Sequence, residues 1–364
     1  MALNIKALVE GAYTHNASDI HVVQDSPTFV RIDGHMRPVS NTHVTKEDIE
    51  ELLRQIMPAE VSGDLQQRRG ADFAWQPDER MRFRVSAYYE RDRLRLVMRL
   101  IRIRIATIDD LGLPEVLKTI ASWHRGITLM TGVTGSGKST TLAAMIDYIN
   151  SRESRCIITI EDPIEMVHTN KKSLISQREV GRDVESFRHG LVQALRQDPD
   201  VILIGEMRDP ETISTALRAA ETGHYVFSTM HTSNALHTVE RILSEFSEEE
   251  HALLRDQLAN NLKATITQRL VRRKGGVGRV AALEIMVVND MIRKLLLENQ
   301  IPSIATVIRE RRDGNVLFDQ FLADLVRSET IDEAEAYQYV EDEAAFRRYV
   351  KGRLATADRG GIIG

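Results

Sequence analysis

The sequence has almost no cysteine, since Cys156 is the single one in 364 residues. One thiol forms neither an internal disulfide nor a cysteine metal cluster, which excludes both from the forces that stabilise this chain. Cys156 begins the apolar run CIITI, so we interpret it as a small residue of a buried strand and not as a nucleophile.

A long apolar run is also missing. No stretch approaches the roughly 20 residues that cross a bilayer. The N-terminal stretch MALNIKALVEGAYTHNASD has neither the basic start nor the apolar core of a secretory signal. We therefore predict a cytoplasmic protein with no direct membrane insertion, which would reach a membrane only through a partner.

An excess of positive charge is absent as well. The chain has 48 basic and 53 acidic side chains and a net charge of -5, so we expect no nucleic-acid partner. Hydrophobic residues make up 42% and charged residues 28% of the chain, which is the balance of a folded globular protein. The length suggests two or three domains.

Residues 1–102 have the pattern of a smaller α+β domain. Apolar residues at helical spacing predict a helix over 5–15. The pair Asp33-Gly34, between alternating apolar residues, predicts a hairpin. The segment 45–54 opens with threonine and has acidic residues in its first turn, which predicts an N-capped helix.

Arginine then alternates with apolar residues over 82–87 and 93–105, which indicates two strands with one basic face. The alternation is lost in a stretch that contains a glycine and a proline, and we place a linker at 103–112. A second domain, 113–340, follows it.

Strand-like runs at 126–132, 156–162 and 200–206 alternate with helical segments in the second domain. This alternation predicts an α/β fold with a mostly parallel, doubly wound sheet covered on both faces. Beyond residue 240 we predict mainly helices, over 247–271, 291–300 and 317–331. We expect a C-terminal tail at 341–364 whose end is disordered.

The segment GVTGSGKST matches the phosphate-binding P-loop and lies between an apolar run and a helical segment, which is the context that the motif requires. Glycine amides would surround the phosphates of ATP, Lys138 would add a charge at the β and γ phosphates, and Ser139 would ligate Mg²⁺. The predicted nucleotide-binding residues are Gly132, Thr134, Gly135, Ser136, Gly137, Lys138, Ser139 and Thr140.

Two further strand ends supply carboxylates. DVILIGE places Glu206 beside the phosphate loop, where a Walker B acid would help to hold Mg²⁺, directly or through water. CIITIEDPIE supplies Glu161, Asp162 and Glu165 on a turn that Pro163 introduces. Either Glu165 or Glu206 suits the positioning of the attacking water. If the turn is only a solvated acidic loop, its substitution leaves hydrolysis intact.

His224 and His231 flank the strand-like run YVFSTM. They are either hydrogen-bonded structural residues or sensors of the γ phosphate. Nine arginines lie between residues 80 and 104 and suit a salt-bridged strand face, whereas the second domain shows no dense arginine cluster next to its P-loop. An arginine finger from a neighbouring subunit's N-terminal domain is one source of the positive charge that hydrolysis needs.

The ordered motifs NASDIH, GVTGSGKST, TIEDPIE, SQREVG, ALRQDPDVILIGEMRD and ETGHYVFSTMHT resemble those of the secretion ATPase superfamily and, within it, the type IV pilus retraction ATPases. The resemblance implies a RecA-like motor domain after a PAS-like N-terminal domain. It also implies a homohexameric ring at the inner-membrane pilus platform protein. ATP hydrolysis there would drive pilin removal and twitching motility.

The resemblance further implies roles for single residues. Glu165 matches the catalytic glutamate, Glu206 the Walker B acid, and His224 and His231 the paired histidines. Lys138 completes the predicted catalytic set. Assembly ATPases of the superfamily usually carry a four-cysteine zinc module, so the single cysteine favours retraction over assembly.

Two departures leave alternatives open. The retraction motif at 291–298 reads MIRKLLLE and loses its second basic position, so the chain is alternatively an accessory ATPase that needs a more active paralogue. The nucleotide-facing arginine is Arg91, Arg93 or Arg99. A RecA-like nucleic-acid motor is a third alternative, which the negative net charge disfavours.

Overall fold

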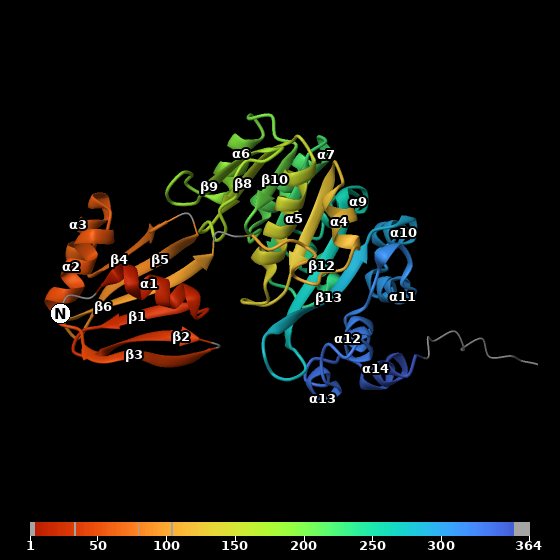
Figure 1. Cartoon of the computed structure of the whole chain (residues 1–364). Coiled ribbons are helices and arrows are strands. Elements are labelled where there is room, and N and C mark those ends of the chain that lie inside the picture. The colour runs from red at the N-terminus through yellow and green to blue at the C-terminus, as the bar shows by residue number, and fades with distance from the viewer. Residues whose placement is uncertain (1–3, 33, 79, 103–104, 353–364) are drawn as a thin grey trace, which may run out of the picture. The chain divides into compact units, whose positions relative to one another are not determined.

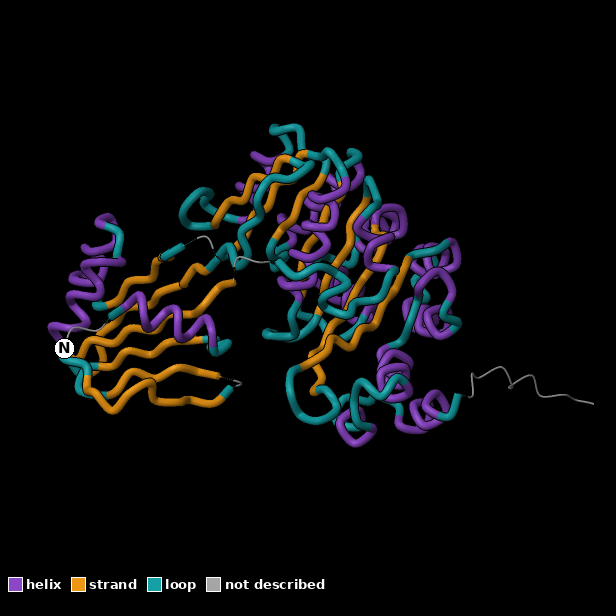
Figure 2. The backbone as a smooth tube through the Cα atoms, viewed as in Figure 1, coloured by secondary structure: helices purple, strands orange, loops and turns teal. Residues whose placement is uncertain are grey.

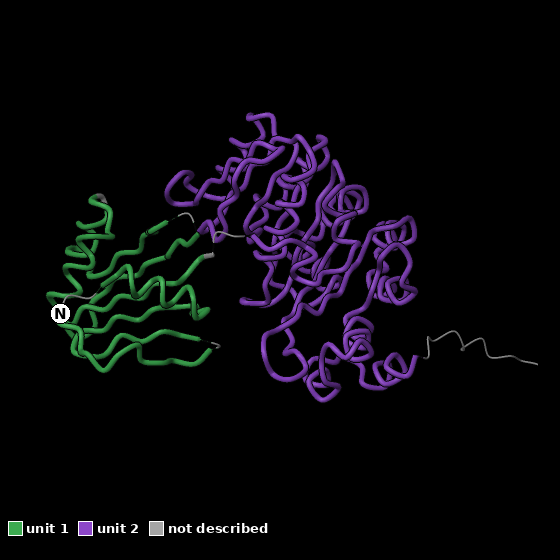
Figure 3. The backbone as a smooth tube through the Cα atoms, in the orientation of Figure 1, with its two compact units in different colours: residues 1–104 green, residues 105–364 purple. Residues whose placement is uncertain are grey.

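The computed structural model describes residues 4–32, 34–78, 80–102 and 105–352. The chain divides into two compact units, residues 1–104 and residues 105–364 (Figure 3). The predicted linker spans this division. Residues 103 and 104 lie outside the described residues, whereas Ile108 is buried in a core of the second unit.

Over its described residues, unit 1 is an antiparallel six-stranded sheet with three helices (Figure 1). The strand order is β3-β2-β1-β6-β5-β4, and each neighbouring pair is antiparallel. Its elements are α1 (Ile5–Thr14), β1 (Asp19–Val23), β2 (Pro27–Ile32), β3 (His35–His43), α2 (Lys46–Ile56), α3 (Ala59–Gln67), β4 (Gly70–Trp75), β5 (Met81–Glu90) and β6 (Arg93–Arg102).

The local signals of unit 1 form the predicted elements. Ile32 pairs with His35 across the predicted hairpin, of which Asp33 lies outside the described residues. Thr45 caps α2 and forms a capping box with Asp48. In β5 and β6 apolar side chains at every second position are buried, among them Phe83 and Leu96, while Arg84 and Arg99 are exposed and pair across the strands. The predicted basic face is therefore present.

Unit 2 is built on a seven-stranded sheet in the order β13-β12-β7-β11-β10-β8-β9, in which β13 alone is antiparallel to its neighbour. The strands are β7 (Gly126–Thr131), β8 (Cys156–Glu161), β9 (Leu174–Glu179), β10 (Val201–Ile204), β11 (Tyr225–Met230), β12 (Leu262–Arg272) and β13 (Arg279–Val287).

Helices cover both faces of this sheet (Figure 2). The described helices of unit 2 are α4 (Val116–Ala121), α5 (Lys138–Arg152), α6 (Phe187–Ala194), α7 (Pro210–Glu221), α8 (Ala235–Ser244), α9 (His251–Asn261), α10 (Asp290–Leu297), α11 (Ile304–Arg309), α12 (Phe318–Arg327), α13 (Glu333–Ala336) and α14 (Glu343–Val350), with 3₁₀ turns at Ile301–Ser303 and Arg312–Gly314.

Alternate residues of the central strands enter different cores. Ile202 and Ile204 pack on one face with α6, α7 and α9, whereas Val201 and Leu203 pack on the other face with α4 and α5. A strand that is buried on both faces reads as a continuous apolar run, which is why the sequence predicts this doubly wound sheet correctly.

The helix predicted over 247–271 is wrong in its second half. Helix α9 ends at Asn261, and the chain continues as β12, which lies between β7 and β13. Leu262, Ala264 and Ile266 are buried at every second position, a spacing that also contains the i, i+4 relation of a helix. The β-branched side chains of this segment and its strand neighbours favour the sheet.

The C-terminal segment is helical where it is described. Helix α14 lies within the predicted tail, and Phe346 is buried with residues of α12 in a shared core. The disorder predicted for the end of the chain falls on residues 353–364, which lie outside the described residues. None of the described helices combines the length and apolar character that crossing a membrane requires.

Cys156 begins β8 and is partly buried. Burial raises the pKa of its thiol, and the nearby Asp200 and Asp198 carboxylates act in the same direction. A raised pKa leaves less of the reactive thiolate at neutral pH, so Cys156 behaves as a strand residue.

Candidate active site

The P-loop connects β7 to α5 and takes the backbone conformation that its glycines allow. Gly132, Gly135 and Gly137 have φ values of 136°, 77° and 89°. A Cβ atom at Gly132 would lie 2.4 Å from the carbonyl oxygen of Gln268, and one at Gly137 would lie 2.7 Å from Gln268 Nε2. A Cβ at Gly135 would meet nothing within 4 Å. Packing on β12 therefore requires two of the glycines, and φ alone requires the third.

Gln268 of β12 contacts the P-loop through its side-chain amide. This side chain is 2% exposed; its Nε2 donates to the Ser136 carbonyl oxygen at 2.8 Å, and its Oε1 accepts from Thr141 Oγ1 at 2.8 Å. It thereby joins the loop to the first turn of α5. Gln268 was not predicted, because the sequence of this segment reads as a helix, in which no signal points to the P-loop.

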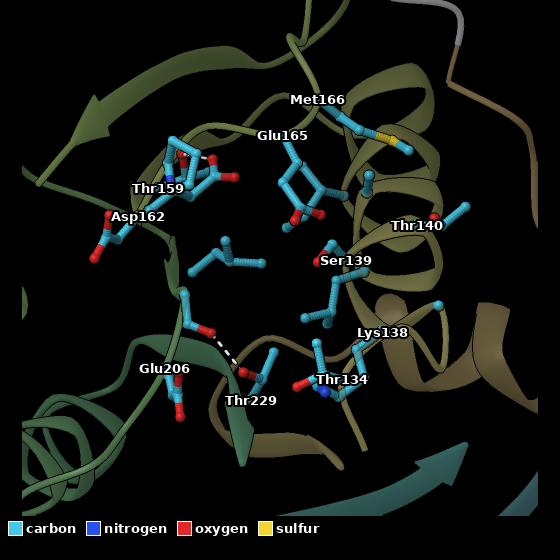
Figure 4. A pocket seen from close by; sticks show the side chains of 18 of the residues that line it. Thr134, Lys138, Ser139, Thr140, Thr159, Asp162, Glu165, Met166, Glu206 and Thr229 are labelled. Atoms are coloured by element: carbon cyan, nitrogen blue, oxygen red, sulfur yellow. Dashed lines mark hydrogen bonds between the residues drawn. The ribbon is translucent and has the colours of Figure 1, made fainter. Parts of the chain in front are cut away.

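A cavity of about 540 Å³ opens above the loop (Figure 4). Of the predicted nucleotide-binding residues, those that line it are Thr134, Gly135, Gly137, Lys138, Ser139 and Thr140. Gly132 and Ser136 do not line it, and Ser136 is 2% exposed. These two shape the loop, and the other six present its surface to a ligand.

Lys138 is folded back onto the loop. Its Nζ donates to the carbonyl oxygens of Gly132 at 2.8 Å and Val133 at 3.1 Å. Burial lowers the pKa of Lys138, while the carboxylates of Glu206 and Glu165 oppose that shift. An ammonium held between carbonyl oxygens can exchange them for phosphate oxygens, which are stronger acceptors.

Glu206 follows β10 and lines the same cavity. Its carboxylate lies 2.7 Å from Arg208 Nη2 and 3.3 Å from His231 Nε2. Burial disfavours the charged form, but the hydrogen bond and charge of Arg208, with His231 and Lys138, outweigh it and lower the pKa of Glu206. Glu206 is therefore held as a carboxylate at neutral pH.

Glu161 at the end of β8 and Glu165 in the acidic turn that follows lie in different environments. Glu161 Oε1 accepts from Thr159 Oγ1 at 2.6 Å and from Gln177 Nε2 at 3.1 Å, and burial raises the pKa of Glu161. Glu165 is exposed and reaches into the cavity (Figure 4). Both side chains line the cavity, but Glu165 is the more exposed of the two and keeps its carboxylate available to a water molecule.

The two predicted histidines lie at opposite ends of β11. His231 lines the cavity beside Glu206. His224 contacts the Ala219 carbonyl oxygen at 2.9 Å through Nδ1, and its own carbonyl oxygen accepts from Gly126 N at the start of β7. The P-loop follows the other end of β7. Within this subunit, His231 lines the cavity, whereas His224 lies at the end of β11 that is remote from the P-loop.

Two arginines of unit 2 line the cavity, although the sequence shows no dense arginine cluster next to the P-loop. They are Arg208, two residues after Glu206, and Arg279 at the start of β13. Of the three unit 1 candidates, Arg99 pairs with Asp19 at 3.0 Å, Arg93 with Asp25 at 3.7 Å, and Arg91 lies in the turn between β5 and β6. Arg208 lies two residues after Glu206 in the sequence, and this proximity could have indicated its place in the cavity.

A family model described as "Type II/IV secretion system protein" matches residues 1–335 of this chain. The type IV pilus retraction ATPase PilT of Pseudomonas aeruginosa is 42% identical over 307 residues, which make up 84% of this chain and 89% of that protein. The type IV pilus ATPase PilU of the same organism is 36% identical over 343 residues, or 94% and 90% of the two chains.

Solved structures are also similar to this chain. The crystal structure of the pilus retraction motor PilT with bound ADP has a TM-score of 0.88 and 39% identity, and the match covers 95% of this chain and 99% of that chain. The ATPase DotB of Legionella pneumophila has a TM-score of 0.81 and 30% identity, with 92% and 94% covered. The RecA-like motor fold and the smaller N-terminal domain predicted from the sequence are thus confirmed.

Proposed function

Since this chain belongs to the type II/IV secretion system protein family, we propose that it is an ATPase that powers type IV pilus retraction and twitching motility. One observation supports the proposal most strongly: a single cavity brings together the P-loop Lys138 and Ser139, the acidic Glu165 and Glu206, and His231. Similarity to PilT over most of both chains supports the choice of retraction.

The polar residues named above have distinct tasks in hydrolysis. The amides of the P-loop and the N-terminus of α5 bind the phosphates of ATP, and Lys138 places its ammonium on the β and γ oxygens. Glu165 orients the attacking water and accepts its proton. Glu206, which is paired with Arg208 and His231, supplies a second carboxylate to the cavity.

The donor set of the cavity suits Mg²⁺. This ion keeps several water ligands and takes one or two protein oxygens together with phosphate oxygens. Ser139 and Glu206 both line the cavity and would hold it. When bound, Mg²⁺ neutralises negative charge that develops during phosphoryl transfer.

We further propose that the chain works as a homohexamer in the cytoplasm, peripheral to the inner membrane, on the platform protein of the pilus. The motif resemblance supports the ring. Two compact units joined near residue 104 are the arrangement in which nucleotide turnover in one unit can move the other through a hinge.

An accessory motor is the second candidate function. PilU matches more of this chain than PilT does, at lower identity, and α10 carries the altered segment MIRKLLLE. In that case the chain adds force to a paralogous retraction ATPase.

Gene deletion in the piliated source organism tests the proposal. If the chain is the primary retraction motor, the deletion strain should carry surface pili but should not twitch. The wild-type gene should restore twitching, and the Lys138→Ala gene should not. An accessory motor predicts twitching that fails only under load. Loss of surface pili, or normal retraction under every load, would contradict both.

A further inference from the structure

The loop that carries Glu165 connects β8 to β9 and is held by a side chain of β9. Gln177 Oε1 accepts from the backbone N–H of His168 at 2.7 Å, and Gln177 Nε2 donates to the carbonyl oxygen of Met166 at 2.8 Å. The same Nε2 donates to Glu161 Oε1 at 3.1 Å. One amide thus joins the loop backbone to the buried acid of β8.

A second side chain of β9 holds the loop on the other side of Glu165. The backbone N–H of Ile164 donates to Glu179 Oε2 at 3.2 Å. Ile164 and Met166 are the two neighbours of Glu165, so β9 fixes the backbone before and after it. Across the described ranges of the chain, the Glu165 carboxylate itself makes no hydrogen bond or ion pair. The backbone that β9 holds therefore fixes the Cα position from which this carboxylate extends.

The far end of the loop is attached to the P-loop helix. Asn150 of α5 accepts from Lys171 N at 3.0 Å and donates to the Thr169 carbonyl oxygen at 2.8 Å. Lys171 Nζ also contacts both carboxylate oxygens of Asp147 at 2.8 Å. The loop is thus attached to α5 at its Lys171 end, and its Glu165 end is positioned by β9.

The contacts at position 177 use both the acceptor and the donors of an amide. A glutamine supplies an acceptor for His168 and donors for Met166 and Glu161 at once. A glutamate keeps the acceptor but loses the donors and adds a charge beside Glu161. An alanine removes all three contacts, but β9 is an edge strand and Gln177 is partly exposed, so the fold should survive the change.

We propose that Gln177 is a positioning residue for ATP hydrolysis, which acts by fixing the backbone that directs Glu165 at the attacking water. The inference rests on the proposed role of Glu165 and assigns to SQREVG a task in the reaction. Gln177 does not line the cavity in which the nucleotide would bind. Its loss should therefore lower kcat and leave nucleotide binding unchanged, since small displacements of a catalytic group cost up to about a hundredfold in rate.

The test is a double-mutant cycle on the full chain with Mg²⁺ and ATP. The variants are Gln177→Ala, Glu165→Gln and the double substitution, and Gln193→Ala, whose amide contacts His189 on α6, is the control. We expect Gln177→Ala to lower kcat about tenfold or more, with KM and the affinity for a fluorescent ADP within about twofold. The double variant should be no slower than Glu165→Gln alone.

The outcomes separate this inference from the proposed function. Full activity of Glu165→Gln overturns the role of Glu165 and, with it, this inference. A slow Glu165→Gln with an unaffected Gln177→Ala overturns the inference alone. Losses that multiply in the double variant, or a raised KM at unchanged kcat, overturn it as well.

Gln177→Glu keeps the test decisive if the alanine variant does not fold. Its titratable neighbours are Glu161, Glu179 and His168. A protonated glutamate regains one O–H donor, so the kcat of this variant should recover relative to wild type as the pH falls from 8 to 6. A ratio of the two kcat values that does not change with pH would overturn the positioning role.

Discussion

At the scale of single residues, the P-loop motif was predictable because its constraints are local. The glycines, Lys138 and Ser139 follow one another in the sequence, and the flanking strand and helix are visible as patterns. Gln268 was not predictable, because its role depends on β12 lying against β7. The place of His224 depends likewise on which end of β11 meets the loop.

Gly137→Ala should damage nucleotide binding directly. The added Cβ would lie 2.7 Å from Gln268 Nε2 at a φ of 89°, and a non-glycine residue in that conformation costs about 1–3 kcal/mol. We expect a fluorescent ATP analogue to bind about tenfold more weakly or worse. Gly63→Ala in α3, where a Cβ meets nothing within 4 Å, is the control and should bind normally. Equal affinities would contradict the packing of Gln268 against the loop.

Glu284→Gln should change how stability depends on pH. Burial raises the pKa of Glu284 to about 7, although its Oε1 accepts from Ala235 N at 2.7 Å. Because the folded pKa lies above the unfolded one, this group stabilises the fold fully below about pH 4.5, and the contribution is lost as the pH rises through 7. The loss is up to about 3 kcal/mol.

Glutamine keeps the acceptor for Ala235 and does not titrate. Denaturant unfolding of unit 2 at several pH values should therefore show that the free energy of unfolding of Glu284→Gln rises relative to that of wild type between pH 4.5 and 8. A stability difference that is constant over this range would mean that Glu284 is not a buried titrating group.

At the scale of elements, the sequence predicted those whose signal lies inside the element. The capping box of α2 and the doubly buried strands β8 and β10 are examples. The prediction of a helix at β12 was wrong, because the apolar spacing of this segment fits both a strand and a helix. Pairing with β7 and β13 favours the strand. The loop geometry that Gln177 fixes is equally a product of strand pairing, since β9 reaches it by lying beside β8.

Ile266→Ala tests the position of β12 within the sheet. Ile266 is 0% exposed and pairs with Met130 and Ile285 on the neighbouring strands, so its truncation should cost about 2–5 kcal/mol. Val277→Ala in the β12–β13 turn, where the side chain is 84% exposed, should stay within about 0.5 kcal/mol of wild type. Similar midpoints in urea for the two variants would rule out a buried central β12.

At the scale of the whole molecule, each unit has a core of its own. Phe83 and Leu96 belong to the core of unit 1, and the sheet of unit 2 is buried between two further cores. Composition and length predicted more than one domain, but the end of the first unit depends on which residues join the second core, as Ile108 does.

Separate cores predict separate responses in calorimetry. ADP should raise the unfolding temperature of unit 2, because it binds the folded P-loop and not the unfolded chain. Phe83→Ala should lower the transition of unit 1 by about 3–5 kcal/mol in free energy and leave the response to ADP unchanged. A single transition that both changes shift would show that the units unfold as one.

The most direct measurement is phosphate release by the purified full-length protein, with Lys138→Ala and the exposed Lys274→Ala compared with wild type. The P-loop cavity predicts hydrolysis that requires Mg²⁺, is lost in Lys138→Ala at an unchanged melting temperature, and persists in Lys274→Ala. Turnover by Lys138→Ala at the wild-type rate would contradict an ATPase site at this loop.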